Sequence, residues 1–211
     1  MPHPAGRQML HLWSLSEDVV VKAGAGDELV LSGRFGTERI EHPDPFLREA
    51  LRRMELGPVL PANVEAMAAN GDFGADACPV PPPTLSRLSH LVVRTLGLDD
   101  LKGPLLSVAP ASRRAIFEPV RLAAQSHLRL RKDVSLTLEG PGVVVRSAAS
   151  LHRVVLHRPE AAWVASTLAW AVTPDEASAA LPLPPEVTEG ILRYLAAAGM
   201  TAPARSAGTP P

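Results

Sequence analysis

The stretch DVVVKAGAGDELVLSGRFGTERIEHP, residues 18–43, decides the fold that we predict for this chain. It holds three short runs rich in valine, leucine and isoleucine, and two glycine-containing turns at 24–27 and 33–36 separate them. Glycine admits positive φ without steric cost, so each turn fits a hairpin. The stretch therefore predicts a three-stranded antiparallel meander whose last strand is Thr37–Glu41.

A helix is predicted directly after this meander. Asp44 is a typical N-cap with Pro45 at the first helical position, and apolar residues then recur at helical spacing until Gly57. Two further helices are expected in this half of the chain, a short one over 63–69 and a third that starts at Thr84. The third helix is inferred from the spacing of Leu85, Leu88, Leu91, Val92 and Leu96.

The same pattern occurs again, about 115 residues further along, in DVSLTLEGPGVVVRSAASLHRVVLHRP, residues 133–159. Helices are predicted after it over 160–171, 174–180 and 185–198. A repeat of this kind indicates one small structural unit that is used twice. The predicted fold class is therefore α+β, with two tandem winged-helix-like modules, each a small antiparallel β-meander followed by about three helices.

The domain boundaries follow from the repeat and from the composition between its copies. Proline-rich and glycine-rich segments are typical of connectors, and segments with little apolar surface to bury are typical of disorder. The predicted segments are a first module at 10–100 with a Pro-rich connector at 71–83, a bridging segment at 101–126, a second module at 127–200 and a disordered tail at 201–211.

Composition and charge limit the class of protein. Hydrophobic residues make up 46% of the 211 residues but aromatic residues only 4%, so we expect leucine-, valine- and alanine-rich cores anchored by Trp13, Trp163 and Trp170. The net charge of −1 gives no global field that attracts nucleic acid or anionic lipid. One cysteine, Cys78, excludes an internal disulfide and fits a cytoplasmic location. The most apolar window, 161–172, is too short to span a bilayer.

The sequence predicts no catalytic, cofactor-binding or metal-binding residue. Its seven histidines are scattered without metal-ligand spacing. The glycine run at 24–26 precedes a strand and not a helix, so it offers no helix N-terminus to a phosphate. His42 and His157 occupy matching strand-to-helix corners, where we expect each imidazole to cap the helix or fill the corner.

A meander followed by helices is also close to the winged helix-turn-helix of DNA-binding proteins. The helix predicted at 185–198 carries Glu186 and Glu189 against one arginine, Arg193, and phosphates repel a negative helix. The third predicted helix of the first module has basic residues but no Asn or Gln that could read a base. Nucleic acid is therefore not an expected partner, and a winged-helix DNA-binding or regulatory protein is kept as an alternative.

Five longer strings are specific as a set: Leu91–Asp100, Gly103–Val108, Arg153–Ala165, Leu181–Pro184 and Tyr194–Met200. Together they resemble the front, non-catalytic region of actinobacterial SagB-type dehydrogenases. These are FMN-dependent, nitroreductase-like azoline dehydrogenases of ribosomal thiazole and oxazole peptide biosynthesis. The resemblance extends over nearly the whole chain.

The resemblance implies peptide recognition without catalysis by this chain alone. In that family a domain that follows this region holds FMN, so no catalytic or flavin-binding residue is carried over, and FMN is expected in a missing domain or a partner subunit. The partners it implies are the leader of a precursor peptide, a separate flavin-dependent dehydrogenase subunit and a cyclodehydratase. No membrane partner is expected, and a homodimer stays open. A flavin-dependent oxidoreductase whose site the sequence does not reveal is a further alternative.

Two strand edges are the predicted peptide sites. An extended peptide can add to an unpaired edge strand through backbone hydrogen bonds while alternate side chains enter a neighbouring groove. By analogy with the family, we expect such edges at Thr37–Glu41 and Leu151–His157, each beside the last helix of its module. The candidate residues are Arg39, Ile40, Leu88, Val92 and Arg94 in the first module and Arg153, Val155, Leu192 and Tyr194 in the second.

Overall fold

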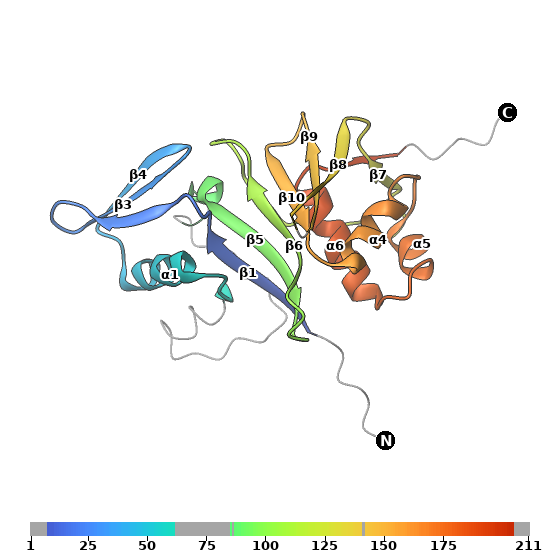
Figure 1. Cartoon of the computed structure of the whole chain (residues 1–211), viewed down its shortest axis with the longest axis horizontal. Helices are drawn as coiled ribbons and strands as arrows, with labels where there is room; N and C mark the ends of the chain where they lie inside the picture. Colours follow the sequence, from blue (N-terminus) through green and yellow to red (C-terminus); the bar gives the residue numbers. More distant parts are fainter. Residues whose placement is uncertain (1–7, 62–84, 86, 141, 205–211) are drawn as a thin grey trace, which may run out of the picture. The chain divides into compact units, whose positions relative to one another are not determined.

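The structure is a computed structural model that describes residues 8–61, 85, 87–140 and 142–204. These residues form a mixed α+β fold, as predicted, in which antiparallel strands and α-helices follow one another along the chain (Figure 1). The chain divides into two compact units. The N-terminal unit consists of Leu10–Thr95 and Ala109–Ile116, and the C-terminal unit of Met1–Met9, Leu96–Val108 and Phe117–Pro211.

The N-terminal unit contains the first predicted meander, an antiparallel sheet in the order β2-β3-β4. The register of its second hairpin runs from Glu28 opposite Glu41 to Gly33 opposite Gly36, which confirms the meander. The elements of this unit are β1 (Met9–Leu15), β2 (Val20–Ala23), β3 (Glu28–Gly33), β4 (Gly36–Glu41), α1 (Pro45–Leu56), the 3-10 helix η1 (Ser89–Leu91) and the first half of β5 (Val92–Leu98), which neighbours β1.

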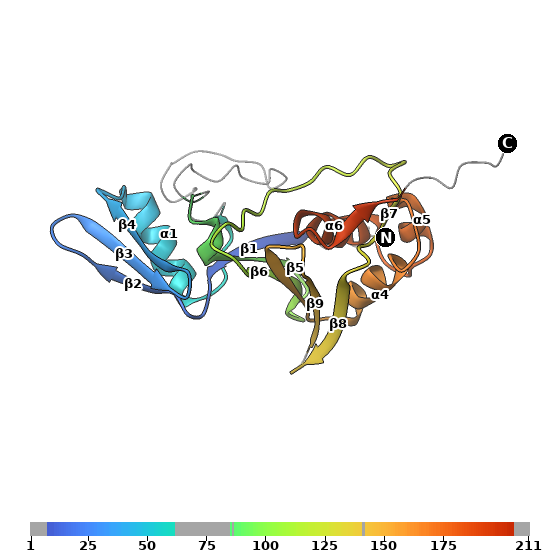
Figure 2. The same ribbon diagram turned by 90° about the horizontal axis from the view of Figure 1, so that it is seen from above.

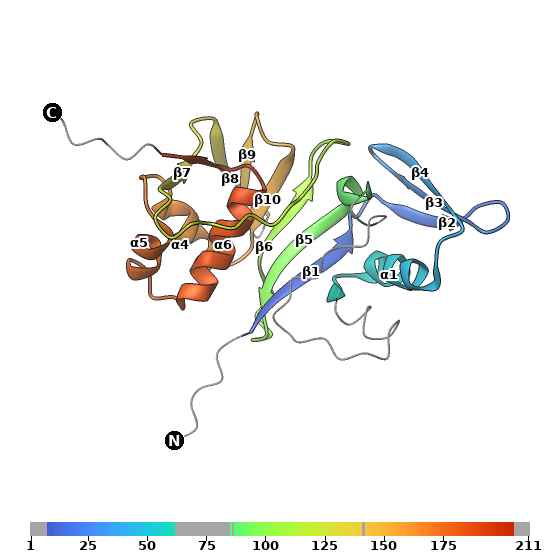
Figure 3. The ribbon, with the colours of Figure 1, turned by 180° about the vertical axis from the view of Figure 1, so that it is seen from behind.

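Helix α1 begins and ends where the sequence predicts. The Asp44 side chain accepts a hydrogen bond from the Leu47 amide at 2.8 Å, Pro45 is the first residue, and the Gly57 amide donates to the Arg53 carbonyl at 3.1 Å. The helix lies along the meander, as Figure 3 shows from behind. Its apolar side and the inner face of the sheet share a core that includes Trp13, Leu15, Leu29, Leu31, Leu47, Leu51 and Met54.

The third helix predicted for the first module is wrong, because its second half is strand β5. Every residue of β5 except Val93 is buried. A central strand with both faces covered has a continuous apolar run, and such a run also satisfies helical spacing. The β-branched residues Val92, Val93 and Thr95 favour the strand. The helix predicted at 63–69 and the connector at 71–83 lie outside the described residues.

The C-terminal unit contains the second predicted meander, followed by α4, α5 and α6. The strands β8, β9 and β10 pair antiparallel, with Leu136 opposite Val145 and Val145 opposite Val154. The strand order in this unit is β5-β6-β10-β9-β8, and β7 and β11 form a separate pair. Its elements after β5 are β6 (Pro104–Pro110), β7 (Leu128–Leu130), β8 (Val134–Glu139), β9 (Gly142–Ser147), β10 (His152–Leu156), α4 (Pro159–Thr167), α5 (Pro174–Ala179), α6 (Pro185–Ala197) and β11 (Thr201–Pro203).

Helices α4 and α6 cover one face of the second meander, and the tip of the β8–β9 hairpin extends beyond them (Figure 2). The residues of this core come from the sheet and from the helices, and most of them are completely inaccessible to solvent. They include Leu105, Leu106, Val145, Val154, Leu156, Val164, Leu168, Ile191, Leu192 and Leu195.

Other details differ from the sequence prediction. Trp13 is buried as predicted, whereas Trp163 and Trp170 are 44% and 71% exposed and therefore are not core anchors. The buried side of α4 is lined by small residues and Val164, which leaves Trp163 on the solvent side. Within the expected bridging segment β6 forms, and Thr201–Pro203 form β11 where the disordered tail was expected to begin.

Candidate functional site

The first predicted peptide edge, Thr37–Glu41, is part of strand β4. Among the described residues, β4 pairs with β3 on one side and with no strand on the other. Alternate backbone N–H and C=O groups of such an edge strand point outward, where an additional strand can bind them. The arrangement of β4 is therefore compatible with strand addition.

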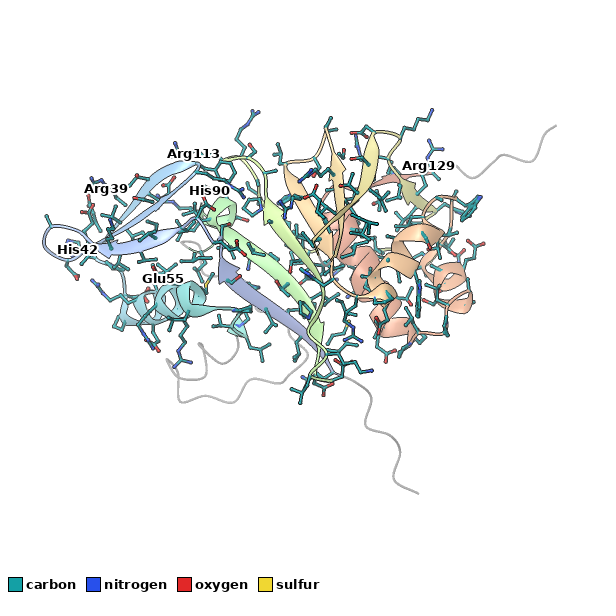
Figure 4. The ribbon with its side chains drawn as sticks, viewed as in Figure 1. Arg39, His42, Glu55, His90, Arg113 and Arg129 are labelled. Atoms are coloured by element: carbon teal, nitrogen blue, oxygen red, sulfur yellow. The ribbon has the colours of Figure 1, made fainter. Side chains whose placement is uncertain are left out.

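The opposite edge of the same sheet, strand β2, is blocked by a side chain. Glu55, near the end of α1, accepts a hydrogen bond from the Val21 amide at 3.1 Å. The carboxylate occupies a backbone donor that an added strand would need. In Figure 4 the labelled Glu55 lies on α1 and the labelled Arg39 on the β3–β4 hairpin. Strand β4 is therefore the more accessible edge of this sheet.

The solvent face of β4 is polar. The Arg39 side chain is 66% exposed, and its Nη1 lies 3.1 Å from Glu28 on β3. In the same row of the sheet, Val30 stands between Arg39 and Lys22 of β2. An exposed ion pair contributes about 0–1 kcal/mol to stability. Little free energy would therefore be lost if Arg39 left Glu28 and paired with a carboxylate of a ligand.

On the other face of β4, Glu38 connects the strand to two further segments of the N-terminal unit. Its Oε1 lies 2.8 Å from Arg113 Nη2 and 3.4 Å from His90 Nε2 (Figure 4). The His90 side chain is 8% exposed and the Arg113 side chain 62% exposed. The hydrogen bond that Arg113 donates is charge-assisted and directional, so it holds the carboxylate in one orientation beside His90. Through Glu38, the inner face of β4 is thereby attached to the buried His90 and to the exposed Arg113.

The groove predicted beside β4 does not form, because its residues are in the core. Leu88 and Val92 are 3% and 2% exposed, and Arg94 is 4% exposed. The Arg94 guanidinium lies over the Trp13 ring, 3.6 Å from its centroid, which is a cation–π contact. Ile40 is partly buried and packs against the same core. A peptide on β4 would therefore meet an edge and not a groove.

The second predicted edge, Leu151–His157, is wrong. This segment contains strand β10, which lies between β6 and β9 in the sheet. Arg153 is exposed and Val155 is partly buried, but the strand has a neighbour on each side. Leu192 is fully buried and Tyr194 is 6% exposed, so both belong to the core. The repeat could not reveal that β6, from a distant part of the sequence, would pair with β10.

The open edge of the C-terminal sheet is instead strand β8, which has β9 as its neighbour among the described strands. Leu136 is 48% exposed and Leu138 is 85% exposed. Sequence reasoning predicted this strand but not its place at the edge. A usable signal was the strict alternation of apolar and polar residues from Val134 to Glu139, which is typical of a strand with one solvated face.

Asp133 fixes the turn that leads into β8. It accepts hydrogen bonds from the Ser147 hydroxyl at 2.5 Å and from the Ala149 amide at 3.1 Å. These two bonds lower the pKa of Asp133 to about 2, because they favour the charged carboxylate. The start of β8 is thereby held to the end of β9.

The two corner histidines have different environments. His157 is half-buried, with Nε2 3.0 Å from Ser107 Oγ, and burial lowers the pKa of its imidazole. It fills its corner, as predicted. His42 has φ 46°, its side chain is 84% exposed, and its Nδ1 lies 3.5 Å from Asp27. Within the ranges that the structure describes, no group of three His, Cys, Asp or Glu residues could hold a metal ion.

Comparison of the sequence with protein-family models and with curated proteins finds no match to either. In the described part of the chain no helix is long and apolar enough to cross a membrane. The features of the described residues that could bind a partner are the two strand edges, β4 and β8.

Proposed function

We propose that this chain is a peptide-recognition protein that binds an extended peptide by strand addition at β4. The observation that carries the proposal is the asymmetry of the N-terminal sheet. Its β2 edge is blocked by Glu55, whereas β4 has no strand neighbour on its outer side among the described residues. Backbone hydrogen bonds to β4 would supply affinity that does not depend on peptide sequence.

Sequence preference would come from the side chains of β4. An added strand places its residues opposite those of β4, and opposite residues share a face of the sheet. On the solvent face a peptide meets Thr37, Arg39 and Glu41, and on the inner face it meets Glu38 and Ile40. The favoured peptide therefore has an acidic residue opposite Arg39 and an apolar residue opposite Ile40, one position away along the strand.

We propose more specifically that the peptide is the leader of a precursor peptide and that the chain works in a SagB-type azoline dehydrogenase system. The support is the set of strings that resembles the front region of those enzymes. FMN and the oxidation step would then belong to a separate flavin-dependent subunit, which works with a cyclodehydratase on the same precursor peptide. This chain would hold the leader while the other subunits act.

We further propose that the C-terminal unit is a winged-helix-like module. The support is the order of its elements, in which the meander β8-β9-β10 is followed by α4, α5 and α6. The N-terminal unit has the meander and α1 in common with it. The two units therefore share their first half, and β5 replaces the last helix predicted for the N-terminal unit.

The direct test is selection of a displayed library of random 12-residue peptides on the full-length chain, followed by titration of the enriched peptide. We expect Arg39→Glu to raise the dissociation constant of that peptide about tenfold, because an attractive pair with an acidic peptide residue becomes a repulsive one. Lys22→Glu is the matched control, with the same charge change in the same row of the sheet but at the β2 edge. Failure to enrich any peptide, or equal losses for both variants, would contradict the proposal.

The flavin-dependent alternative is separated by a second titration. If FMN belongs to a partner subunit, this chain should leave the fluorescence of added FMN unchanged at tens of micromolar protein. Saturable quenching of FMN by the full-length chain would instead favour the oxidoreductase and would count against a purely peptide-binding role.

A further inference from the structure

The exposed strand β8 alternates strictly between apolar and polar residues. Val134, Leu136 and Leu138 occupy one face of the strand, and Ser135, Thr137 and Glu139 occupy the other. Leu136 lies opposite Val145, which belongs to the core of this unit, and Val134 packs against the same core, so the three apolar residues are on the core side of the sheet. The helices do not cover this part of the face, since Leu136 and Leu138 are 48% and 85% exposed.

Among the residues that the structure describes, the strand also lacks the features that usually keep an edge from pairing. Natural edges are protected by lysine, proline, bulges or a covering element. Between Val134 and Glu139 there is no lysine, arginine or proline. The one charge, on Glu139, is paired with Arg146 of β9 at 2.8 Å. Within the described part of the chain, an edge of six regular residues with exposed leucines is therefore available to a further strand.

We infer that β8 pairs antiparallel with β8 of a second copy of this chain, so that two C-terminal sheets join across a two-fold axis. The strand is complementary to itself in one register. In that register Leu136 stands opposite the second copy's Leu138, and Thr137 stands opposite the second copy's Thr137. Ser135 then stands opposite the second copy's Glu139, a hydroxyl beside a carboxylate. Apolar and hydroxyl pairs of this kind stabilise neighbouring strands.

Other registers are unfavourable for physical reasons. A slip by one residue places every leucine opposite a polar residue, which moves the apolar side chains to the wrong face. A slip by two residues that puts Leu136 opposite the second copy's Leu136 also puts Asp133 opposite the second copy's Glu139. Like charges directly opposite one another destabilise a strand pair. The opposite slip by two residues, centred on Leu138, places Leu136 opposite the second copy's Gly140 and loses its contact with a leucine. The register centred on Thr137 is therefore the one that pairs both leucines without opposing like charges.

The chemistry favours a second copy over a transient peptide. Interfaces between identical subunits are more apolar than interfaces that form and dissociate. The core side of β8 offers leucines, whereas β4 offers charged side chains. The inference is independent of the proposed function, because it concerns a different strand and unit.

The test is disulfide cross-linking of the full chain in a Cys78→Ser background, with Thr137→Cys compared with Ser135→Cys. Directly opposite residues have Cα atoms about 4.5–5.5 Å apart, within the range of a disulfide. Two Ser135 positions would be offset by four residues, about 13 Å, which is too far. Both sites are exposed on β8, so the second variant is a control for random collision.

We expect Thr137→Cys to give a cross-linked dimer of about twice 22.4 kDa under mild oxidation and Ser135→Cys to stay at least tenfold less cross-linked. Light scattering of the unoxidised full chain should give the same dimer mass. Equal cross-linking of both variants would mean collision or another register and would overturn the inference. A monomeric mass up to hundreds of micromolar would overturn it as well and would leave β8 to a different partner.

Discussion

The two open edges, β4 and β8, belong to similar meanders but occupy opposite ends of them. In the N-terminal meander the first strand is blocked by Glu55, and the third has no strand on its outer side among the described residues. In the C-terminal meander the third strand pairs with β6, and the first has β9 as its one neighbour within the strands that the structure describes. β4 presents Arg39 and Glu41, whereas β8 exposes Leu136 and Leu138. Repetition of a fold pattern therefore does not repeat its binding surface.

The largest predicted effect follows from giving β8 the charged character of β4. The double variant Leu136→Lys with Leu138→Lys should raise the dimer dissociation constant by more than about 100-fold, because charges then face each other across the axis. Sedimentation of the full chain over a concentration series measures this.

Leu56→Lys is the matched control for that variant. Leu56 is 78% exposed at the end of α1, and a lysine there should leave the dimer unchanged. If the control dissociates the dimer as strongly as the double variant, β8 is not the interface.

The next largest effect is expected at the inner face of β4. Glu38→Ala removes the carboxylate that holds Arg113 and His90, and we expect a loss of about 1–2 kcal/mol in the free energy of unfolding, with weaker binding of the selected peptide. Urea unfolding measures the first quantity and titration the second. Glu41→Ala, on the exposed face of the same strand, should change stability by less than about 0.5 kcal/mol.

The sequence predicted local structure well and the partners of each strand poorly. Turn glycines, the Asp44 cap and alternating runs act over a few residues, so the two meanders and the helices α1, α4, α5 and α6 could be expected from them. The pairing of β10 with β6 depends on residues far apart in the sequence. No local pattern encodes such a contact, and the predicted edge at Leu151–His157 failed for that reason.

The local nature of sequence patterns also explains which candidate binding residues the sequence located correctly and which it did not. The spacing of the apolar residues, Leu88 and Val92 among them, satisfies a helical period as well as a buried strand, so the sequence predicts Leu88, Val92 and Arg94 on a helix beside a groove. The structure puts them in or next to β5 and in the core. Arg39 and Ile40 were placed correctly on an edge strand because that strand is the last of a meander joined by short turns.

A smaller effect is predicted at the blocked edge of the N-terminal sheet. Glu55→Ala frees the Val21 amide, so the β2 edge should become accessible and the Val21 amide should exchange its hydrogen a few times faster. Amide exchange followed by NMR measures this. An unchanged rate would mean that Glu55 does not protect the edge, and the asymmetry between β2 and β4 would lose its basis.

The smallest effect is a pH dependence at the start of β8. The pKa of Asp133 is about 2 in the folded chain and 3.8 in an unperturbed carboxyl, so its stabilising contribution is present above pH 4 and is lost as the pH falls from 4 to 2. Asp133→Asn should reduce the fall in melting temperature across that window. Equal falls for the two proteins would show that the bonds to Ser147 and Ala149 do not hold the turn.

Hydrogen exchange of the full chain tests most directly the claim that the two edges serve different partners. At low and high protein concentration without peptide, amides of Ser135–Glu139 should become more protected as concentration rises, while those of Thr37–Glu41 stay unchanged. Addition of the selected peptide should then protect Thr37–Glu41 alone. The claim would be contradicted if a rise in concentration, or the peptide, protected both strands together. It would also be contradicted if neither condition protected either strand.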